Sequence, residues 1–375
     1  MASSTIDKRP NGRYRARYIG PDRKWHSKTF DLQVNAKRWE REQLARIDRG
    51  EWVDPNAGNR TLGETAERWE SGRLAKRPST RLRDHNYLNS LILPHLGPKP
   101  LSSITPSVLE AWVAQLVADG KAPATVRKAW QIASSVLALA VRDRLIASSP
   151  AFGVELPRVE REEPLFLEWP EVEELAYSID QRYRVMVMVG ALAGLRVGEV
   201  CGLKVEDIDL LRRRLFVRRT VGNVNGSTEA GRPKTEKSFR SVALPPVLVG
   251  ELETHFGQLS NSSPDAWLFP SPKGGPLDSK NWNRRVWKPA VKAASLPERL
   301  RFHDLRHSHV ALLIEVGEHP RTIADRLGHT NVNTVLNVYG HLFEGTDEAA
   351  ADRIHERIAS YSRPGVKRTK VTALP

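Results

Sequence analysis

The N-terminal part of the chain alternates polar and apolar positions with a period of two. In GRYRARYIG, residues 12–20, arginines alternate with aromatic and small apolar residues, which predicts a strand with one buried face. A Pro-Asp turn and the segment 24–30 predict a second strand. The pattern then changes to a helical period, and we expect a helix with Asn35 as its N-cap and Gly50 as its stop.

Helical spacing dominates residues 61–150. Thr61 and Glu64 have the spacing of a capping box, in which each side chain bonds to the backbone N–H of the other residue. A Thr-Pro pair that begins at Thr105 predicts the start of a further helix, which ends before a glycine. Apolar residues continue at helical spacing over 123–146. We therefore expect this region to be all-helical.

Two segments rich in proline and polar residues, 54–60 and 148–164, are linkers by composition. In the region that follows, 211–221 and 238–245 read as strands joined by a glycine-rich turn region. Gly194 is expected to end one of the helices. The apolar spacing predicts helices over 170–179, 182–193, 197–203, 281–294, 304–316, 320–327, 332–339 and 347–360.

These patterns predict an α+β multidomain protein, since 375 residues are too many for one ordinary core. We expect a small β-sheet-plus-helix domain at 1–56, an all-α domain at 61–150, a mainly α domain with a small antiparallel sheet at 165–345, and a C-terminal helix with a basic tail at 346–375.

The charge of the chain favours a polyanionic partner. The net charge is +14, and residues 1–60 alone carry 14 Lys or Arg against 8 Asp or Glu. Such a concentration of positive charge is typical of nucleic-acid binding, although a solvated basic surface would give the same count. We favour DNA binding, because the basic residues coincide with a separate small β domain.

Cysteine content and hydropathy exclude several classes of protein. Cys201 is the single cysteine, so neither an intramolecular disulfide nor a cysteine-based zinc finger can form, and a reducing, cytoplasmic location is expected. We interpret Cys201 as a small core residue. The N-terminus lacks the apolar region of a signal peptide. The sequence contains no run of 18 apolar residues, the length that a membrane-spanning helix needs.

Residues suited to phosphate chemistry concentrate in the last third of the chain. The segment HDLRH places His303 and Arg306 on one face of a helix, and a Gly-His pair and a Val-Tyr pair follow with His329 and Tyr339. Cleaving DNA without losing the bond energy requires a protein nucleophile, surrounded by charge stabilisers and proton donors. Two guanidiniums suit a phosphorane because each is a planar, bidentate donor. Arg196 would supply the second.

The motifs GLRVGE, PKT, HDLRH, LGH and VYGH occur in this order, and together they resemble those of the tyrosine recombinases, the family of lambda integrase, the Xer proteins and Cre. The resemblance covers residues 165–345. A small basic β domain and a helical domain precede it in the order found in many phage and mobile-element integrases, where the first binds arm-type DNA sites and the second core-type sites.

The resemblance implies a role for each residue of the motifs. Arg196 and Arg306 would clamp the scissile phosphate, and His329 would hydrogen-bond to it. Tyr339 would attack and form a 3′-phosphotyrosine, with His303 as the base or proton shuttle nearby. Glu199 matches an acidic residue that orients the site, and Lys234 would protonate the leaving 5′-oxygen; Lys237 lies close enough in the sequence to compete for that role.

The resemblance also implies partners. The chain would act as a homotetramer on two DNA duplexes, through a Holliday junction, with no cofactor and no metal; an excision factor and a host DNA-bending protein are further candidate partners. The C-terminal helix, with Ala349, Ile354 and Ile358 on one side, would either dock on a neighbouring protomer or pack within its own chain. The charge pattern predicts DNA contacts from Arg13, Arg15 and Arg17 of the small sheet, which would read a groove. It predicts phosphate contacts from residues of the helical domain, namely Lys76, Arg77, Arg81, Lys121 and Arg127.

The same residues allow three other interpretations. His303 and His307 are four apart, as in a zinc-binding helix, but the cation of Arg306 would lie beside the metal. The segment 321–339 has the spacing of a helix-turn-helix, which would suit a transcription regulator. A regulator has no need of the upstream arginine and lysine, however. A type IB topoisomerase uses similar chemistry, and the separate basic domain argues for a recombinase instead.

Overall fold

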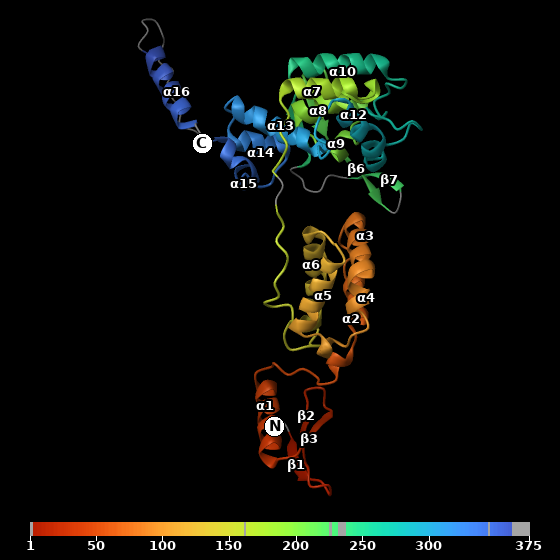
Figure 1. Cartoon of the computed structure of the whole chain (residues 1–375), viewed down its shortest axis with the longest axis vertical. Helices are drawn as coiled ribbons and strands as arrows, with labels where there is room; N and C mark the ends of the chain where they lie inside the picture. Colours follow the sequence, from red (N-terminus) through yellow and green to blue (C-terminus); the bar gives the residue numbers. More distant parts are fainter. Residues whose placement is uncertain (1–2, 161–162, 225–226, 232–237, 344–345, 362–375) are drawn as a thin grey trace. The chain divides into compact units, whose positions relative to one another are not determined.

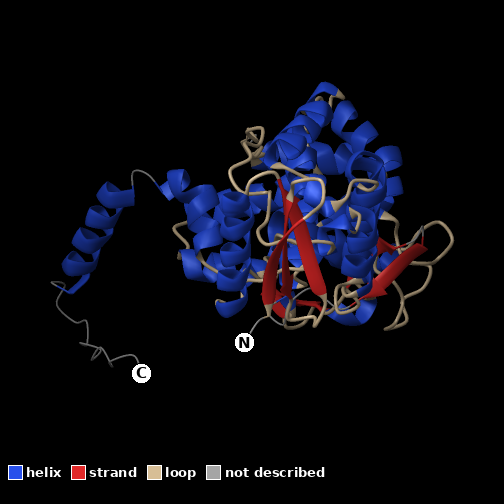
Figure 2. Ribbon diagram, turned by 90° about the horizontal axis from the view of Figure 1, so that it is seen from below, coloured by secondary structure: helices blue, strands red, loops and turns tan. Residues whose placement is uncertain are grey.

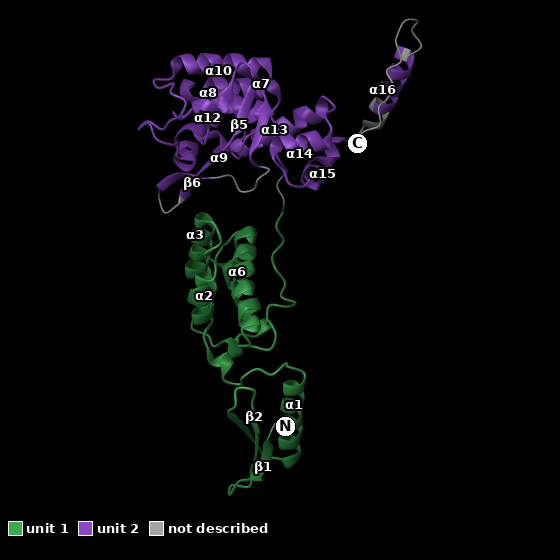
Figure 3. Ribbon diagram, turned by 180° about the vertical axis from the view of Figure 1, so that it is seen from behind, with its two compact units in different colours: residues 1–161 green, residues 162–375 purple. Residues whose placement is uncertain are grey.

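The computed structural model describes residues 3–160, 163–224, 227–231, 238–343 and 346–361 (Figure 1). The chain divides into two compact units, residues 1–161 and 162–375, which Figure 3 shows in different colours. Among the described residues, no helix combines the length and the apolar character that crossing a membrane requires.

Unit 1 begins with a three-stranded antiparallel sheet in the order β1-β2-β3. The strands β1 (Ser4–Lys8), β2 (Tyr14–Ile19) and β3 (Trp25–Phe30) pack against helix α1 (Gln33–Asp48). The alternation in β2 gives the predicted buried face, on which Ala16 and Tyr18 lie. Strand β1 was not predicted.

The expected N-cap of α1 was wrong. Asn35 lies inside the helix, and Leu32 occupies the N-cap position without a side-chain cap. The expected stop is confirmed, because Gly50 follows the helix with a φ of +69°, in the left-handed region that favours glycine.

The second part of unit 1 is helical. Its helices are α2 (Leu62–Ser71), α3 (Pro78–Tyr87), α4 (Leu93–Leu96), α5 (Pro106–Ala118) and α6 (Pro123–Arg142), with a π turn at Leu88–Ile92 and 3₁₀ turns at Ala57–Asn59 and Leu101–Ser103.

The predicted helix starts in this part of unit 1 are confirmed. The N–H of Glu64 donates to Thr61 Oγ1 at 3.2 Å and the N–H of Thr61 to Glu64 Oε2 at 2.8 Å, which completes the capping box. Thr105 caps α5 in the predicted way. Leucines and other apolar residues from these helices form one core.

Unit 2 is mainly helical and contains a small sheet. Figure 2 colours the helices of the whole chain blue and its strands red. Its helices are α7 (Trp169–Ser178), α8 (Arg184–Ala193), α9 (Val197–Val200), α10 (Pro246–Gln258), α11 (Ser279–Trp282), α12 (Lys288–Ala293), α13 (Phe302–Glu315), α14 (Pro320–Leu327), α15 (Asn333–Tyr339) and α16 (Thr346–Tyr361). Shorter 3₁₀ turns lie at Gln181–Tyr183, Val205–Asp207 and Gly340–Phe343, and a π turn at Asn283–Trp287.

The sheet of unit 2 has the order β4-β5-β8, formed by Ile208–Asp209, Arg214–Val217 and Arg240–Ala243. The two predicted strands thus pair with each other, with Leu215 opposite Val242. The region between them was expected to be a turn, but it contains a separate hairpin of β6 (Thr220–Val224) and β7 (Ser227–Gly231).

Helix α8 is the centre of the main core of unit 2, because all its residues except the first are buried. Helix α13 packs along it, and the close approach depends on Gly190, where an added Cβ would come within 2.9 Å of Phe302 and Leu305. A second apolar cluster joins α13, α14 and α15 around Val310, Leu327 and Tyr339.

Candidate active site

Helix α13 supplies the central guanidinium of the site. Its first turn is held by Asp304, whose Oδ2 accepts from the N–H of Arg301 at 2.7 Å. One turn later, Arg306 is only 2% exposed. Its Nη1 donates to the Gly194 carbonyl at 2.6 Å, and its Nη2 to the Leu327 carbonyl at 2.7 Å. The buried guanidinium therefore joins three segments that are far apart in the sequence.

Burial lowers the pKa of Arg306 to about 9, with a further contribution from the positive charge of Arg196. The guanidinium remains protonated at neutral pH and is poorly solvated. An anion that enters the site would therefore interact with it more strongly than with an exposed arginine.

Gly194 makes the geometry around Arg306 possible. The residue ends α8 in the left-handed region with a φ of +65°, and an added Cβ would lie 2.5 Å from a ring carbon of His309. Glycine therefore fits both the backbone conformation and the space. The chain turns here, so that Arg196 becomes the N-cap of α9 with its side chain 40% exposed.

Glu199 is buried and binds two arginines. Its Oε1 accepts from Arg196 Nη1 at 2.8 Å, and its Oε2 accepts from the Arg196 backbone N–H and from Arg240 Nη2, both at 3.0 Å. Burial by itself would raise the pKa of this carboxyl, but the hydrogen bonds and charge of Arg240 bring it below the usual range. Glu199 is thus ionised and fixes the direction of Arg196.

We expect Glu199→Gln to lower both stability and activity. Arg240 is almost fully buried, and it would keep its charge without a counterion, which costs about 3–5 kcal/mol when a buried pair is broken. Urea unfolding would measure the loss. The exposed pair Arg182–Asp180 provides the control, because Asp180→Asn is expected to change the unfolding free energy by less than about 1 kcal/mol. Equal effects of the two substitutions would contradict this account of Glu199.

His329 follows the helix stop at Gly328, which has a φ of +69°. Its Nε2 lies 3.0 Å from Arg306 Nη2. Since a guanidinium can only donate, Nε2 accepts, and the neutral ring carries its proton on Nδ1. That Nδ1 is buried and has no partner among the described residues. Burial, followed by the charge of Arg306, lowers the pKa of His329 to about 4, so the ring is a neutral donor at neutral pH.

Tyr339 is the last residue of α15 and is 4% exposed. Its ring contacts Phe166, with the ring centroids 6.5 Å apart. The hydroxyl is hydrogen-bonded to Nδ1 of His307 at 2.6 Å. Burial raises the pKa of Tyr339 to about 12, although the charge of Arg306 acts in the opposite direction. The phenol is therefore neutral in the protein without DNA.

The predicted base, His303, reaches this pair indirectly. Its ring meets that of His307 edge to face, with the centroids 4.9 Å apart. Burial, followed by the proximity of His307, lowers the pKa of His303 to about 4. From the sequence, His307 was interpreted only as a mimic of a zinc ligand. Its spacing of four from His303 was the available signal that both rings share one helix face.

Two more residues behind the site were not predicted. His309 donates from Nδ1 to the Ala191 carbonyl at 2.9 Å and accepts at Nε2 from Arg326 at 3.0 Å. The Arg326 guanidinium also donates to the Leu192 carbonyl at 3.1 Å, and its own carbonyl accepts from Arg240 at 2.7 Å. These bonds connect α14 with α8 and β8, and so stabilise the segment that carries His329.

Two predicted residues cannot be placed. Lys234 and its competitor Lys237 lie outside the described residues, between β7 and β8. Among the described residues, no group of three His, Cys, Asp or Glu side chains could hold a metal ion. Cys201 is buried, as predicted, and burial raises the pKa of its thiol to about 12.

The arginines of the small sheet that were predicted to contact DNA form ion pairs with acidic residues. Arg13 pairs with Asp31 at 2.8 Å, and Asp7 lies 3.1 Å from Arg15 and 3.6 Å from Arg17. Because neighbouring residues of β2 point to opposite faces, Arg15 and Arg17 lie on the face away from α1. In the helical part, five predicted residues are exposed: Lys76, Arg77, Arg81, Lys121 and Arg127.

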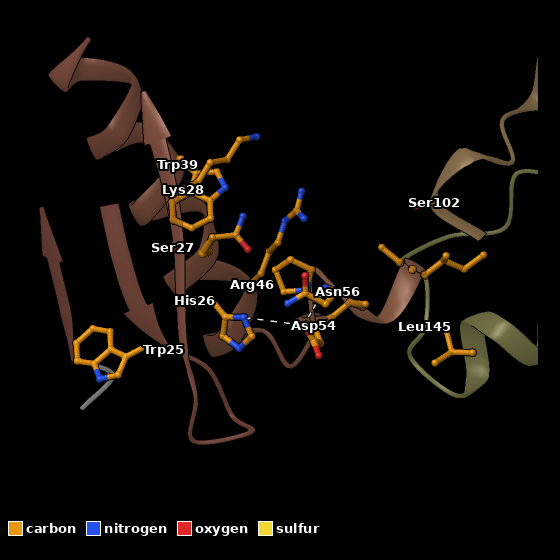
Figure 4. Close-up of a pocket in the computed structure, with 16 residues that line it drawn as sticks. Trp25, His26, Ser27, Lys28, Trp39, Arg46, Asp54, Asn56, Ser102 and Leu145 are labelled. Atoms are coloured by element: carbon orange, nitrogen blue, oxygen red, sulfur yellow. Dashed lines mark hydrogen bonds and ion pairs between the residues drawn. The ribbon is translucent and has the colours of Figure 1, made fainter. Parts of the chain in front are cut away.

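Unit 1 also contains a cavity of about 570 Å³ (Figure 4). His26, Lys28, Trp39, Arg46 and Asp54 are among its lining residues, and none of the candidate catalytic residues is. His26 Nε2 lies 3.0 Å from an oxygen of Asp22, and Nδ1 is 3.9 Å from Asp54. The Asp22 contact lies within the β2–β3 hairpin, and the Asp54 contact connects β3 with the segment after α1.

Three family models match the chain. That of the phage integrase family matches residues 166–345, that of the phage integrase N-terminal domain residues 4–49, and that of the phage integrase N-terminal SAM-like domain residues 61–117.

Relatives match along nearly the whole chain. The putative prophage phiRv2 integrase of Mycobacterium tuberculosis is 30% identical over 91% of this chain and 92% of its own length. The integrase of Mycobacterium phage L5 is 28% identical over 91% of this chain and 94% of its own length.

Solved structures show the same fold. The Tn1549 transposon integrase in complex with transposon right end DNA has a TM-score of 0.69 at 21% identity, over 80% of this chain and 100% of that one. A lambda integrase dimer bound to a core site has a TM-score of 0.58 at 17% identity, over 98% and 97% of the two chains. The chain therefore belongs to the phage integrase family and is a tyrosine recombinase, an enzyme that breaks and rejoins DNA strands.

Proposed function

We propose that this recombinase joins an attachment site of a phage or another mobile element to a chromosomal site. One observation carries the catalytic part of the proposal. Arg306 binds His329 directly and shares α13 with His307, which holds the Tyr339 hydroxyl. Groups that bind phosphate are thus assembled around the same helix that contacts the nucleophile.

In the proposed reaction, the Tyr339 Oη attacks the phosphorus while Arg196 and Arg306 bind the nonbridging oxygens. The bond between phosphorus and O5′ breaks, so that a 3′-phosphotyrosine and a 5′-hydroxyl form. His329 donates to the phosphate from Nδ1, which has no partner within the part of the chain that the structure describes. The leaving oxygen takes its proton from Lys234, and His303 serves as a proton shuttle.

We propose that unit 1 provides two DNA-binding domains, residues 1–56 for arm-type sites and 61–150 for core-type sites, and that residues 165–345 form the catalytic domain. Two solved structures support DNA binding by this fold. The Tn1549 transposon integrase was solved with DNA, and a lambda integrase tetramer was solved on a Holliday junction. In this chain, Arg15 and Arg17 share Asp7, and a phosphate could displace that carboxylate.

A tetramer would also explain the surface of α16. Ile354 is 61% exposed and Ile358 is 60% exposed. Large apolar residues on one side of a helix are typical of a surface that a partner covers. We therefore favour docking of α16 on a neighbouring protomer, with strand exchange in pairs through a Holliday junction. The side chain of Ala349 lies outside the described residues.

The catalytic proposal is tested with nicked duplexes that tile the DNA on either side of the coding sequence. In such substrates the short 5′-hydroxyl strand diffuses away after cleavage, which traps the covalent intermediate. We expect one duplex to give a protein–DNA complex that resists SDS. If every duplex is bound and none is linked, and a plasmid carrying both flanks does not recombine, the proposal is refuted.

We expect deletion of residues 1–58 to separate the two kinds of DNA contact. Helix α2 begins at Leu62 with its own capping box and its own core, so the remaining protein should fold. Cleavage of core-site duplexes should stay within about threefold of the full chain. Recombination of a plasmid with complete attachment sites should fall by a factor of about 10 or more, because several phosphate contacts are lost.

The matched control for the deletion is the full chain with Arg13, Arg15 and Arg17 changed to alanine. It should reproduce the recombination defect if the defect reflects lost DNA binding. Unchanged recombination by the truncated protein would contradict the assignment of residues 1–56 to a second DNA site.

A further inference from the structure

His307 is hydrogen-bonded to the hydroxyl of the proposed nucleophile, whereas the family resemblance assigns roles only to His303 and Arg306 of the same motif. Its Nδ1 is 2.6 Å from the Tyr339 hydroxyl, the separation of a short, well-formed hydrogen bond. The two rings have centroids 5.6 Å apart. The nearest other ring on the same helix is that of His303, 4.9 Å away. The three side chains thus form a row from α15 to the first turn of α13.

We propose that His307 is the base that accepts the proton of Tyr339 as the hydroxyl attacks the phosphate. This assignment rests on the proposed function, because it needs Tyr339 to be the nucleophile. The distance satisfies the geometric requirement for a general base, which must lie within about 2.6–3.2 Å of the proton donor.

The proton balance of the step is complete. The hydroxyl of Tyr339 gives its proton to Nδ1 of His307 while Oη forms the bond to phosphorus. The bond from phosphorus to O5′ breaks, and the leaving oxygen receives a proton from the general acid assigned to Lys234. His307 becomes an imidazolium that holds the proton, with His303 beside it as the next carrier. When the 5′-hydroxyl attacks the phosphotyrosine, the same proton returns to Oη.

The environment of His307 suits this task. Burial lowers the pKa of His307, while Asp304 acts in the opposite direction and the charges of Arg301 and Arg306 add to the lowering. The ring is therefore neutral at neutral pH, and one nitrogen is available as an acceptor. The phenol has a pKa of about 12, so transfer to His307 is unfavourable before DNA binds. We therefore expect proton transfer to His307 to accompany the attack on the phosphate.

The test compares His307→Asn with His307→Ala and with His303→Asn. The asparagine amide can place an oxygen near the position of Nδ1 and keep the hydrogen bond to Tyr339, but it cannot take a proton. Single-turnover cleavage is measured on a nicked core-site duplex and on the same duplex with sulfur in place of the bridging O5′. A thiolate leaves without a proton, so the sulfur substrate bypasses the general acid and not the base.

We expect His307→Asn to cleave at least about 100-fold more slowly than the unmodified chain on both substrates, with DNA binding unchanged. His307→Ala should be at least as slow, and His303→Asn should lose less. Cleavage by His307→Asn within about threefold of the unmodified chain would overturn the proposal, because a role in positioning alone would be preserved. Recovery of His307→Asn on the sulfur substrate would also overturn it, since the defect would then concern the leaving group.

The fold of each variant is checked by its unfolding midpoint and its DNA affinity. If His307→Asn is unfolded, His307→Gln takes its place with the same two readings. Failure of the proposed function looks different: the unmodified chain would then form no covalent complex on either substrate. A chain that cleaves normally while its His307→Asn variant does the same would refute only the role of His307.

Discussion

Replacing Tyr339 with phenylalanine should abolish covalent complex formation on nicked attachment-site DNA. The change removes one oxygen, and with it the atom that would form the bond to phosphorus. We expect the cleavage rate to fall by a factor of about 10⁴ or more, as for the loss of other protein nucleophiles. Denaturing gel electrophoresis of the protein–DNA complex measures the effect, and a mobility shift measures binding.

The structure indicates that this variant will fold. The ring stays in the cluster of α13, α14 and α15, and only the hydrogen bond to His307 is lost, worth about 1 kcal/mol. Tyr183→Phe is the matched control, because Tyr183 is equally buried in unit 2 and lies outside the site. It should cleave DNA at the normal rate. A covalent complex of normal yield with Tyr339→Phe would show that another residue attacks.

Arg306→Ala should produce the second large effect. The variant leaves the carbonyls of Gly194 and Leu327 without their donor, and each buried, unsatisfied group costs about 1–3 kcal/mol. Relief from burying a cation offsets part of that cost, so we expect a net loss of about 2–4 kcal/mol in the free energy of unfolding. Cleavage should fall by a factor of about 10³ because the guanidinium no longer stabilises the phosphorane.

Urea unfolding and single-turnover cleavage measure the two consequences of Arg306→Ala separately. Arg182→Ala is the control, since Arg182 is exposed and pairs with Asp180 on the surface of the same unit. It should change stability by less than about 1 kcal/mol. If Arg306→Ala had the unfolding free energy and the cleavage rate of the unmodified chain, Arg306 would neither stabilise the site nor bind the phosphate, which would contradict this prediction.

The parts of the fold that depend on local sequence were predictable. Thr61 and Glu64 form the expected capping box, and Gly194 and Gly328 end helices at positions where the backbone enters the left-handed region. Helix α13 carries His303 and Arg306 on neighbouring turns, as the spacing of three implied. These features follow from side chains and backbone within one or two turns of each other.

The parts that depend on tertiary approach were missed. Asn35 was expected to cap α1, but that helix begins at Gln33 with Leu32 at the N-cap position and no side-chain cap. The segment of β6 and β7 contains glycines and polar residues, so a turn was expected there. It forms strands because the two halves of the segment pair with each other.

In the site, the motifs identified the residues that we propose to contact the phosphate, whereas the residues behind them came only from the structure. Arg240 and Arg326 are two of 41 arginines, and nothing in their local sequence distinguishes them from exposed ones. The contact of His307 with Tyr339 joins residues 32 positions apart. It depends on how α15 returns to α13, which helical spacing does not specify.

The most direct measurement is the identification of the residue that becomes linked to DNA. The trapped complex of the unmodified chain with a nicked attachment-site duplex is digested with nuclease and protease, and the peptide that carries the nucleotide is sequenced by mass spectrometry. Our account predicts a single modified residue, Tyr339, attached to the 3′-phosphate of the cleaved strand. A nucleotide on any other residue, or a link to a 5′-phosphate, would contradict it.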